Sequence, residues 1–189
     1  SVLSSAREVF GDSQGLDLAG KVAGVHWWYD DPSHPAEATS GYYNTDGHDA
    51  YQEIAKVFAE YNVSMDFTCL EMSNSQQPKE CESNPEGLVR QVLQATVGSG
   101  IKFNGENALR RYDVDAYDKM LTYRQRMTEL VYLRLGPTLL EPGNLGRFQE
   151  FVADMHAGGS ATVTIGPPDN SSSSAPSTPT RGGGHFRRL

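Results

Sequence analysis

The sequence predicts an α/β protein built on a parallel β-sheet, and three observations lead to this prediction. Four short apolar segments, rich in β-branched and aromatic residues, have the length and composition of strands. Stretches with apolar residues at helical spacing separate these segments. The resulting order, αβαβαβαβα, is typical of parallel strands joined by helical crossovers. A doubly wound sheet and a (β/α) barrel both satisfy this order.

The predicted strands cover residues 21–26 (KVAGVH), 63–71 (VSMDFTCLE), 101–107 (IKFNGEN) and 130–135 (LVYLRL). Crossovers between parallel strands are almost always right-handed. We therefore expect the four strands to lie side by side in chain order, with helices on one side of the sheet.

The predicted helices cover residues 2–10, 48–61, 84–93, 113–121 and 144–157. Asn84 and Pro85 are typical of a helix N-cap followed by a first-turn proline. By similar reasoning, Asn144 is predicted to cap the last helix, which Gly158 and Gly159 would end.

The composition changes near residue 160 and divides the chain into two parts. Residues 1–159 are predicted to fold. Residues 160–189 are dominated by serine, proline and glycine. Such a segment buries too little apolar surface to offset the entropy of ordering, so it is predicted to be a disordered tail.

Charge and composition exclude several classes of partner. The net charge is −8 and the pI is about 5.0, so the phosphate backbone of nucleic acid would repel the chain. No apolar run approaches the roughly 20 residues of a membrane helix. The chain opens on Ser1 without a leader-like pattern, and no signal peptide is expected. Its two cysteines form neither a disulfide framework nor a metal-type CxxC pair.

Polar and aromatic side chains follow the predicted strands, where parallel α/β folds gather their ligand sites. They include a carboxylate, an amide, a hydroxyl, an imidazole, a guanidinium and two indoles. Sugar hydroxyls need paired donors and acceptors, and flat rings such as Trp27 or Trp28 suit the C–H faces of pyranoses. The mixture favours a carbohydrate ligand, although each residue taken singly also fits a solvated rim or an ion pair. No cofactor is predicted, because no metal cluster, P-loop or Gly-rich nucleotide turn is visible.

Five blocks of the sequence resemble consecutive blocks of the β-amylase family, in the family's order and with similar spacing. They are GVHWWY (24–29), AEATSGYYN (36–44), FTCLEM (67–72), GENALRRYD (105–113) and YLRL (132–135). The resemblance covers roughly residues 1–157. It implies a (β/α)₈ TIM barrel, of which this chain supplies about the last four βα units. It also implies a glycosidase that hydrolyses α-1,4-glucan (starch or maltodextrin) from the non-reducing end, releasing maltose with inversion.

The resemblance also assigns residues to roles. Glu106, in GENAL, matches the general base that activates the attacking water. The residues that match substrate contacts are Lys21, His26, Thr68, Asn107, Ala108 and Arg134. An intracellular site, in the plastid or the cytosol, is favoured by the same resemblance.

The chain also departs from the family pattern. The family's general acid lies in a block resembling GxxGELRYPSY, which is absent from these residues, and Arg110 replaces the proline after GENAL. The segment between Tyr117 and Tyr132 is shorter than usual. An inverting glycosidase needs two carboxyl groups, so the isolated chain is predicted to be inactive. The alternative is a catalytically inactive β-amylase-like protein that binds glucan or acts in regulation.

Overall fold

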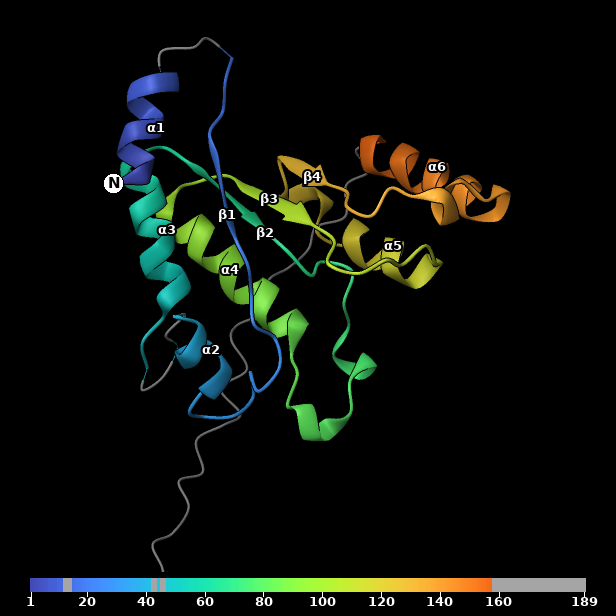
Figure 1. Cartoon of the computed structure of the whole chain (residues 1–189), viewed down its shortest axis with the longest axis horizontal. Helices are drawn as coiled ribbons and strands as arrows, with labels where there is room; N and C mark the ends of the chain where they lie inside the picture. The colour runs from blue at the N-terminus through green and yellow to red at the C-terminus, as the bar shows by residue number, and fades with distance from the viewer. Residues whose placement is uncertain (12–14, 42–43, 45–46, 158–189) are drawn as a thin grey trace, which may run out of the picture.

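The chain forms a four-stranded parallel sheet, shown in Figure 1 as a computed structural model. The structure describes residues 1–11, 15–41, 44 and 47–157. The order in the sheet is β1-β2-β3-β4, and every neighbouring pair is parallel. The predicted order and direction of the strands are therefore confirmed. The strands are β1 (Ala19–Val22), β2 (Ser64–Phe67), β3 (Phe103–Glu106) and β4 (Glu129–Val131).

Helices occupy the intervals between the strands, and each predicted helix is present. The α-helices are α1 (Val2–Phe10), α2 (Pro35–Ser40), α3 (Ala50–Glu60), α4 (Pro85–Ser99), α5 (Val114–Leu121) and α6 (Pro142–His156). The short 3-10 turns are η1 (Asn74–Gln76), η2 (Lys79–Cys81), η3 (Arg124–Arg126) and η4 (Pro137–Leu140). The sequence patterns did not predict α2 or the 3-10 turns.

Side-chain caps determine where two of the helices begin. Asn84 accepts a hydrogen bond from the N–H of Gly87 at 2.7 Å, as its predicted role as the cap of α4 requires. Asp113 accepts one from the N–H of Ala116 at 3.1 Å at the start of α5. Each bond satisfies a backbone donor that the first turn of an α-helix leaves without a partner.

The predicted cap of the last helix was wrong. The residue preceding α6 is Glu141, so Asn144 lies inside the helix. The Asn144 amide donates instead to the carbonyl oxygen of Thr138 at 2.8 Å. The predicted helix end at residues 158–159 and the predicted tail at 160–189 lie outside the described residues.

The strands are shorter than the sequence pattern indicated. The first spans Ala19–Val22 rather than residues 21–26, and the fourth spans Glu129–Val131 rather than residues 130–135. The second ends at Phe67 rather than at residue 71. Cys69 has a φ of 62°, which lies outside the β region and turns the chain out of the sheet. The polar residues expected at the strand ends therefore lie partly in the loops that follow.

The core lies between one face of the sheet and helices α3 and α4, which pack on β2 and on each other. Side chains alternate along a strand, so Met65, Phe67 and Phe103 point to this face, and none is more than 3% exposed. They belong to one buried cluster with Leu88 and Val92 of α4. Burial of one such side chain stabilises the fold by about 1.5–3 kcal/mol. The opposite face of the sheet carries polar residues.

Helix α1 is held mainly by polar contacts within the described part of the chain. The Arg7 guanidinium donates to the carbonyl oxygens of Tyr61 and Asn62, which follow α3. Val9 and Phe10 are exposed. None of the described helices combines the length and apolar content that a membrane span needs.

Gly105 of β3 packs against the core with no room for a side chain. A Cβ atom at this position would overlap the side chains of Leu70 and Met127. We predict that Gly105→Ala lowers the free energy of unfolding by about 1–3 kcal/mol, the usual cost of overpacking. Urea unfolding of the chain, followed by circular dichroism, measures this change.

Gly146→Ala in α6 is the matched control. A Cβ atom there meets nothing within 4 Å, and alanine is favoured over glycine inside a helix by about 0.8–1 kcal/mol. This variant should be neutral or stabilising. A Gly105→Ala variant as stable as the parent would contradict the close packing of β3.

Candidate active site

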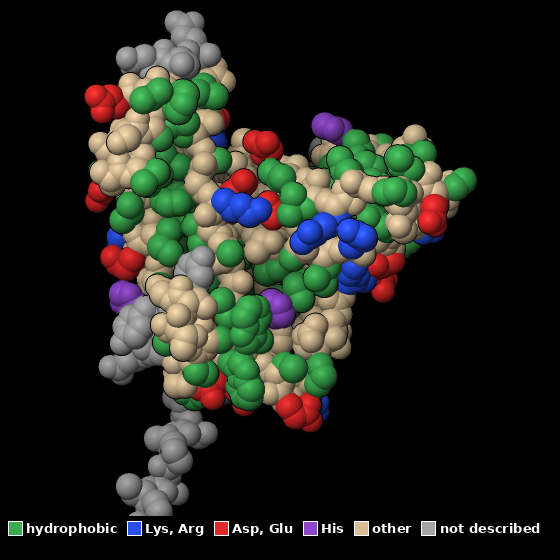
Figure 2. Space-filling model, viewed as in Figure 1, with side chains coloured by type: hydrophobic (Ala, Val, Ile, Leu, Met, Phe, Trp, Pro, Cys, Tyr) green, Lys and Arg blue, Asp and Glu red, His purple; other side chains and the backbone are tan. Residues whose placement is uncertain are grey.

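A layer of polar side chains crosses the face of the sheet opposite to the core. The strand register sets Lys21 of β1 beside Asp66 of β2, and Asp66 beside Asn104 of β3. Glu129 of β4 lies next to Asn104 in turn. Because side chains alternate, Glu106 lies on the same face as Asn104, one step nearer the C-terminal end of the strand. In Figure 2, acidic and basic side chains adjoin one another across the middle of the visible face.

Glu106 is the last residue of β3, and its side chain is only 4% exposed. Its Oε2 atom accepts a hydrogen bond from the ammonium group of Lys21, which is half exposed. The pair spans from β1 to β3, across β2. A buried carboxylate is costly unless it is paired and hydrogen-bonded. Lys21 therefore compensates the charge of Glu106, while about half of the Lys21 side chain stays exposed to solvent.

Asp66 lies partly buried beside this pair. Burial raises the pKa of its carboxyl group, the charges of Glu106 and Glu129 raise it further, and Lys21 opposes them. The Oδ1 atoms of Asp66 and Asn104 are buried without a hydrogen-bond partner among the described residues. In that part of the chain no group of three or more His, Cys, Asp or Glu residues could hold a metal ion. The layer therefore offers acceptor oxygens rather than a metal centre.

Asn107, the residue after β3, uses its side chain to hold the backbone. Its Oδ1 accepts from the N–H of Leu133 at 2.6 Å. Its Nδ2 lies 3.1 Å from the carbonyl oxygen of Leu109 and 3.3 Å from that of Leu133. The segment after β3 is thus fixed to the segment after β4. Both amide donors and one lone pair of Oδ1 are thus used within the protein.

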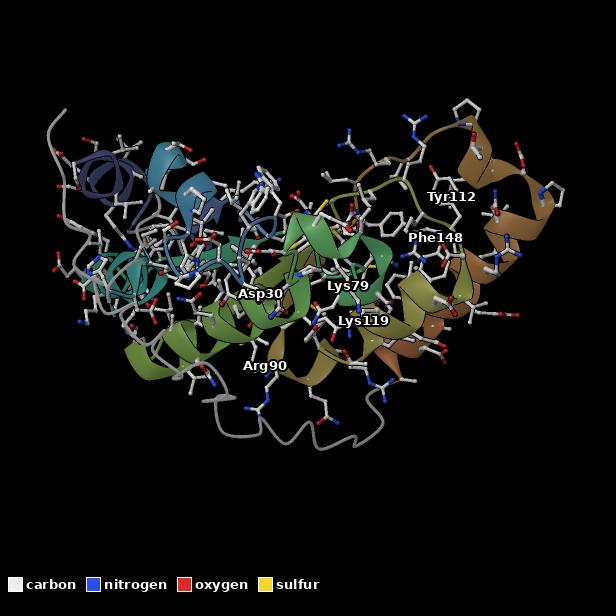
Figure 3. All side chains as sticks on the ribbon, turned by 90° about the horizontal axis from the view of Figure 1, so that it is seen from below. Asp30, Lys79, Arg90, Tyr112, Lys119 and Phe148 are labelled. Atoms are coloured by element: carbon white, nitrogen blue, oxygen red, sulfur yellow. The ribbon has the colours of Figure 1, made fainter. Side chains whose placement is uncertain are left out.

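Arg134 follows β4 and lies next to the segment after Glu106. Its Nη2 atom is 3.4 Å from the carbonyl oxygen of Ala108, and its own carbonyl oxygen accepts from the hydroxyl of Tyr112 at 2.8 Å. Tyr112 lies near the start of α6 in Figure 3, where Arg147 donates to its carbonyl oxygen at 2.8 Å. The exposed guanidinium of Arg134 is thereby held beside the end of β3.

His26 and Thr68 follow β1 and β2 at the same edge of the sheet. The Nδ1 atom of His26 lies 2.6 Å from the hydroxyl of Ser83, and burial lowers the pKa of the imidazole. His26 is therefore mainly neutral at pH 7. In the part of the chain that the structure describes, neither residue is hydrogen-bonded to Glu106. The structure thus brings Lys21 into contact with Glu106, but His26 and Thr68 only to the same edge.

Glu71 adjoins the site and was not predicted as a site residue, although it belongs to the FTCLEM block (67–72). Its buried carboxylate accepts hydrogen bonds from the N–H groups of Ala108 and Leu109. The sequence signal is weak: one acid between Leu70 and Met72, which are both buried. Such a residue can be found only once the positions of the backbone donors are known.

An apolar pocket lies elsewhere, between β4 and α6. Its walls include Leu130, Tyr132, Phe148 and Phe151, and none of the predicted site residues lines it. The polar chemistry is therefore gathered at the ends of the strands and not in this pocket.

Parallel strands with helical crossovers and a polar site at their C-terminal ends define an α/β protein of the class that includes (β/α) barrels. The sequence model of "Glycosyl hydrolase family 14" matches residues 1–161. The chain belongs to this family. The resemblance to β-amylases and the α/β fold, with about four βα units of a (β/α)₈ barrel, are confirmed.

The most similar proteins found include several β-amylases. "Beta-amylase 2, chloroplastic" from Oryza sativa subsp. japonica is 44% identical over 164 residues, which are 84% of this chain and 29% of that protein. "Beta-amylase" from Vigna unguiculata is 42% identical over 154 residues, 75% of this chain and 31% of that protein. The catalytic domain of β-amylase from Paenibacillus polymyxa superimposes with a TM-score of 0.65 at 26% identity, over 80% of this chain and 36% of that domain. The chain therefore spans about a third of the length of these proteins.

Asp66 and Asp113 should give opposite pH dependences of stability. The raised pKa of Asp66 means that its contribution favours folding at low pH and is lost as the pH rises through its folded pKa. The hydrogen bond from Arg111 lowers the pKa of Asp113, so its contribution is present above the unfolded value of about 3.9 and is lost below it. We predict that, at pH 7, Asp66→Asn raises the Tm and Asp113→Asn lowers it.

Thermal unfolding at pH 7 and at about pH 3 tests this pair, since both effects should shrink near the lower pH. A fall in Tm for Asp66→Asn at pH 7 would show that its charged form is favoured by the fold.

Proposed function

We propose that this chain is part of a β-amylase that hydrolyses the α-1,4-glucosidic linkages of starch from the non-reducing end, releasing maltose with inversion. Glu106 is the general base, which takes a proton from the water that attacks the anomeric carbon. A general acid about 6.5–9.5 Å from the base must protonate the leaving oxygen. The block that resembles the family's acid is not among these 189 residues. The glucan contacts are Lys21, His26, Thr68, Asn107, Ala108 and Arg134.

The position of Glu106 is the observation that carries the proposal. It is a buried carboxylate on the polar face at the C-terminal end of a barrel strand, the edge where (β/α) barrels hold their catalytic groups. A purely structural ion pair with a neighbouring arginine has less support, because Arg111 pairs with Asp113 at 2.5 Å. Glu106 instead pairs with Lys21, whose side chain is half exposed.

An inactive β-amylase-like protein that binds glucan or regulates is the second candidate. Arg110 in place of the family's proline favours it. Arg110 is exposed, however, so the exchange leaves the buried contacts of Glu106 in place. A GELRYPSY-like block in a longer reading frame would favour the enzyme.

The proposed partner is α-1,4-glucan, with neither nucleic acid nor a membrane. Two rice relatives are named chloroplastic, which supports a plastid site over a cytosolic one. Import of the longer protein, tagged with a fluorescent protein, into plant chloroplasts would decide between the two compartments.

The role of Glu106 is best tested in a complete barrel. In a chimera, here called the rice chimera, this chain replaces the matching residues of Beta-amylase 2 from Oryza sativa. We predict that Glu106→Gln lowers kcat on soluble starch by about 10²–10⁴-fold, because glutamine cannot accept the proton from water. Glucan affinity should change little, since the sugar contacts remain.

Glu86→Gln is the matched control. Glu86 also pairs with a lysine: its Oε1 lies 2.9 Å from the Nζ of Lys119 on α5 (Figure 3), and Glu86 is on α4 rather than on a strand. Its loss should affect stability and leave kcat per folded molecule unchanged. If Glu106→Gln kept more than about a tenth of the parent kcat, the general-base role would be ruled out.

The isolated 189-residue chain should release no measurable maltose. The loss of the general acid alone costs about 10²–10⁴-fold in rate. Chromatography of digests of soluble starch, with the rice chimera as the positive control, measures the product. Clear turnover by the isolated chain would contradict this prediction and require an acid among its own residues.

A further inference from the structure

Glu71 holds the backbone that follows Glu106. Its carboxylate is 1% exposed. Its oxygens lie 2.9 Å and 3.0 Å from the N–H of Ala108, and Oε1 lies 2.5 Å from the N–H of Leu109. One buried anion therefore binds the second and third backbone donors after Glu106.

The chain turns sharply after β2 to present this carboxylate. Cys69 has a φ of 62°, and the N–H of Met72 returns to the carbonyl oxygen of Cys69 at 3.1 Å. Leu70 and Met72 are buried on either side of Glu71 and anchor the turn in the core. The N–H of Leu70 also donates to the carbonyl oxygen of Glu106 at 3.3 Å. The turn thus contacts the backbone both at Glu106 and just beyond it.

We propose that Glu71 is a positioning residue that fixes the carboxylate of Glu106 for base catalysis. The inference rests on the proposed function. Charge-assisted hydrogen bonds from backbone N–H groups to a buried carboxylate are short and strong, and their loss would leave two N–H groups without acceptors. Residues 106–109 would then relax, and a shift of about 1 Å in a reacting group can cost about 10²-fold in rate.

Glu37 provides a matched control for the effect of removing a buried acid. It is also 1% exposed. It accepts hydrogen bonds from the hydroxyl of Tyr51 at 3.1 Å and the amide of Asn44 at 3.0 Å. It belongs to α2 and contributes no bond to the segment after β3 in the part of the chain that the structure describes. Loss of Glu37 should cost stability without moving Glu106.

The experiment compares Glu71→Met and Glu71→Gln with Glu37→Met and Glu37→Gln in the rice chimera. We expect Glu71→Met to lower kcat per folded molecule by about 10²-fold with KM unchanged. Glu71→Gln keeps one acceptor oxygen and should lose less. The Glu37 variants should lose stability but keep kcat. Equal losses at the two positions, or an unchanged kcat in Glu71→Met, would overturn the proposal.

Hydrogen exchange of the peptide containing residues 107–110 separates this inference from the proposed function. Glu71→Met should accelerate exchange at Ala108 and Leu109, whereas Glu37→Met should not. Unchanged exchange in Glu71→Met would overturn the proposal that Glu71 fixes residues 106–109, whatever the activity of the variant. A parent chimera that releases no maltose would reject the proposed function, and the exchange result would still decide whether Glu71 holds this segment.

Discussion

The hydrogen bond between Lys21 and Glu106 depends on the register of the parallel strands, which decides the face of the sheet on which each side chain lies. Along parallel strands in this register, alternate side chains face either the apolar core or the polar side. A shift of one residue in β3 would send Glu106 into the core and Phe103 to the polar face. The burial of Phe103 in the core cluster, together with the lack of space at Gly105, therefore sets the position of the carboxylate.

Rigidity at the end of β3 comes from polar contacts made by neighbouring segments. The side chain of Asn107 ties this segment to the end of β4, and Glu71 ties it to the turn after β2. A general base must be held close to its productive geometry, and hydrogen bonds to surrounding backbone are a common way to achieve this. In this account, Asn107 contributes mainly by fixing the backbone, with limited capacity left for direct contact with the sugar.

The sequence predicted the strands, their order and the location of Glu106, because periodicity and turn residues report local structure directly. Other features were beyond it. The positive φ of Cys69 is unusual for a residue other than glycine, and the roles of Glu71 and Asn107 depend on backbone groups from distant loops. The prediction that Asn144 caps the last helix was wrong because it overlooked Pro142. This residue is itself a first-turn proline that marks the true start of α6.

The central claim is that Glu106 activates water on the face opposite the leaving group. Chemical rescue tests it most directly: Glu106→Ala in the rice chimera removes the base, and azide, an anionic nucleophile that needs no deprotonation, can take the place of the water. The account predicts that azide restores turnover and yields β-maltosyl azide, identified by the anomeric coupling in its NMR spectrum. Formation of the α-anomer, or a Glu106→Ala variant as active as the parent without azide, would contradict it.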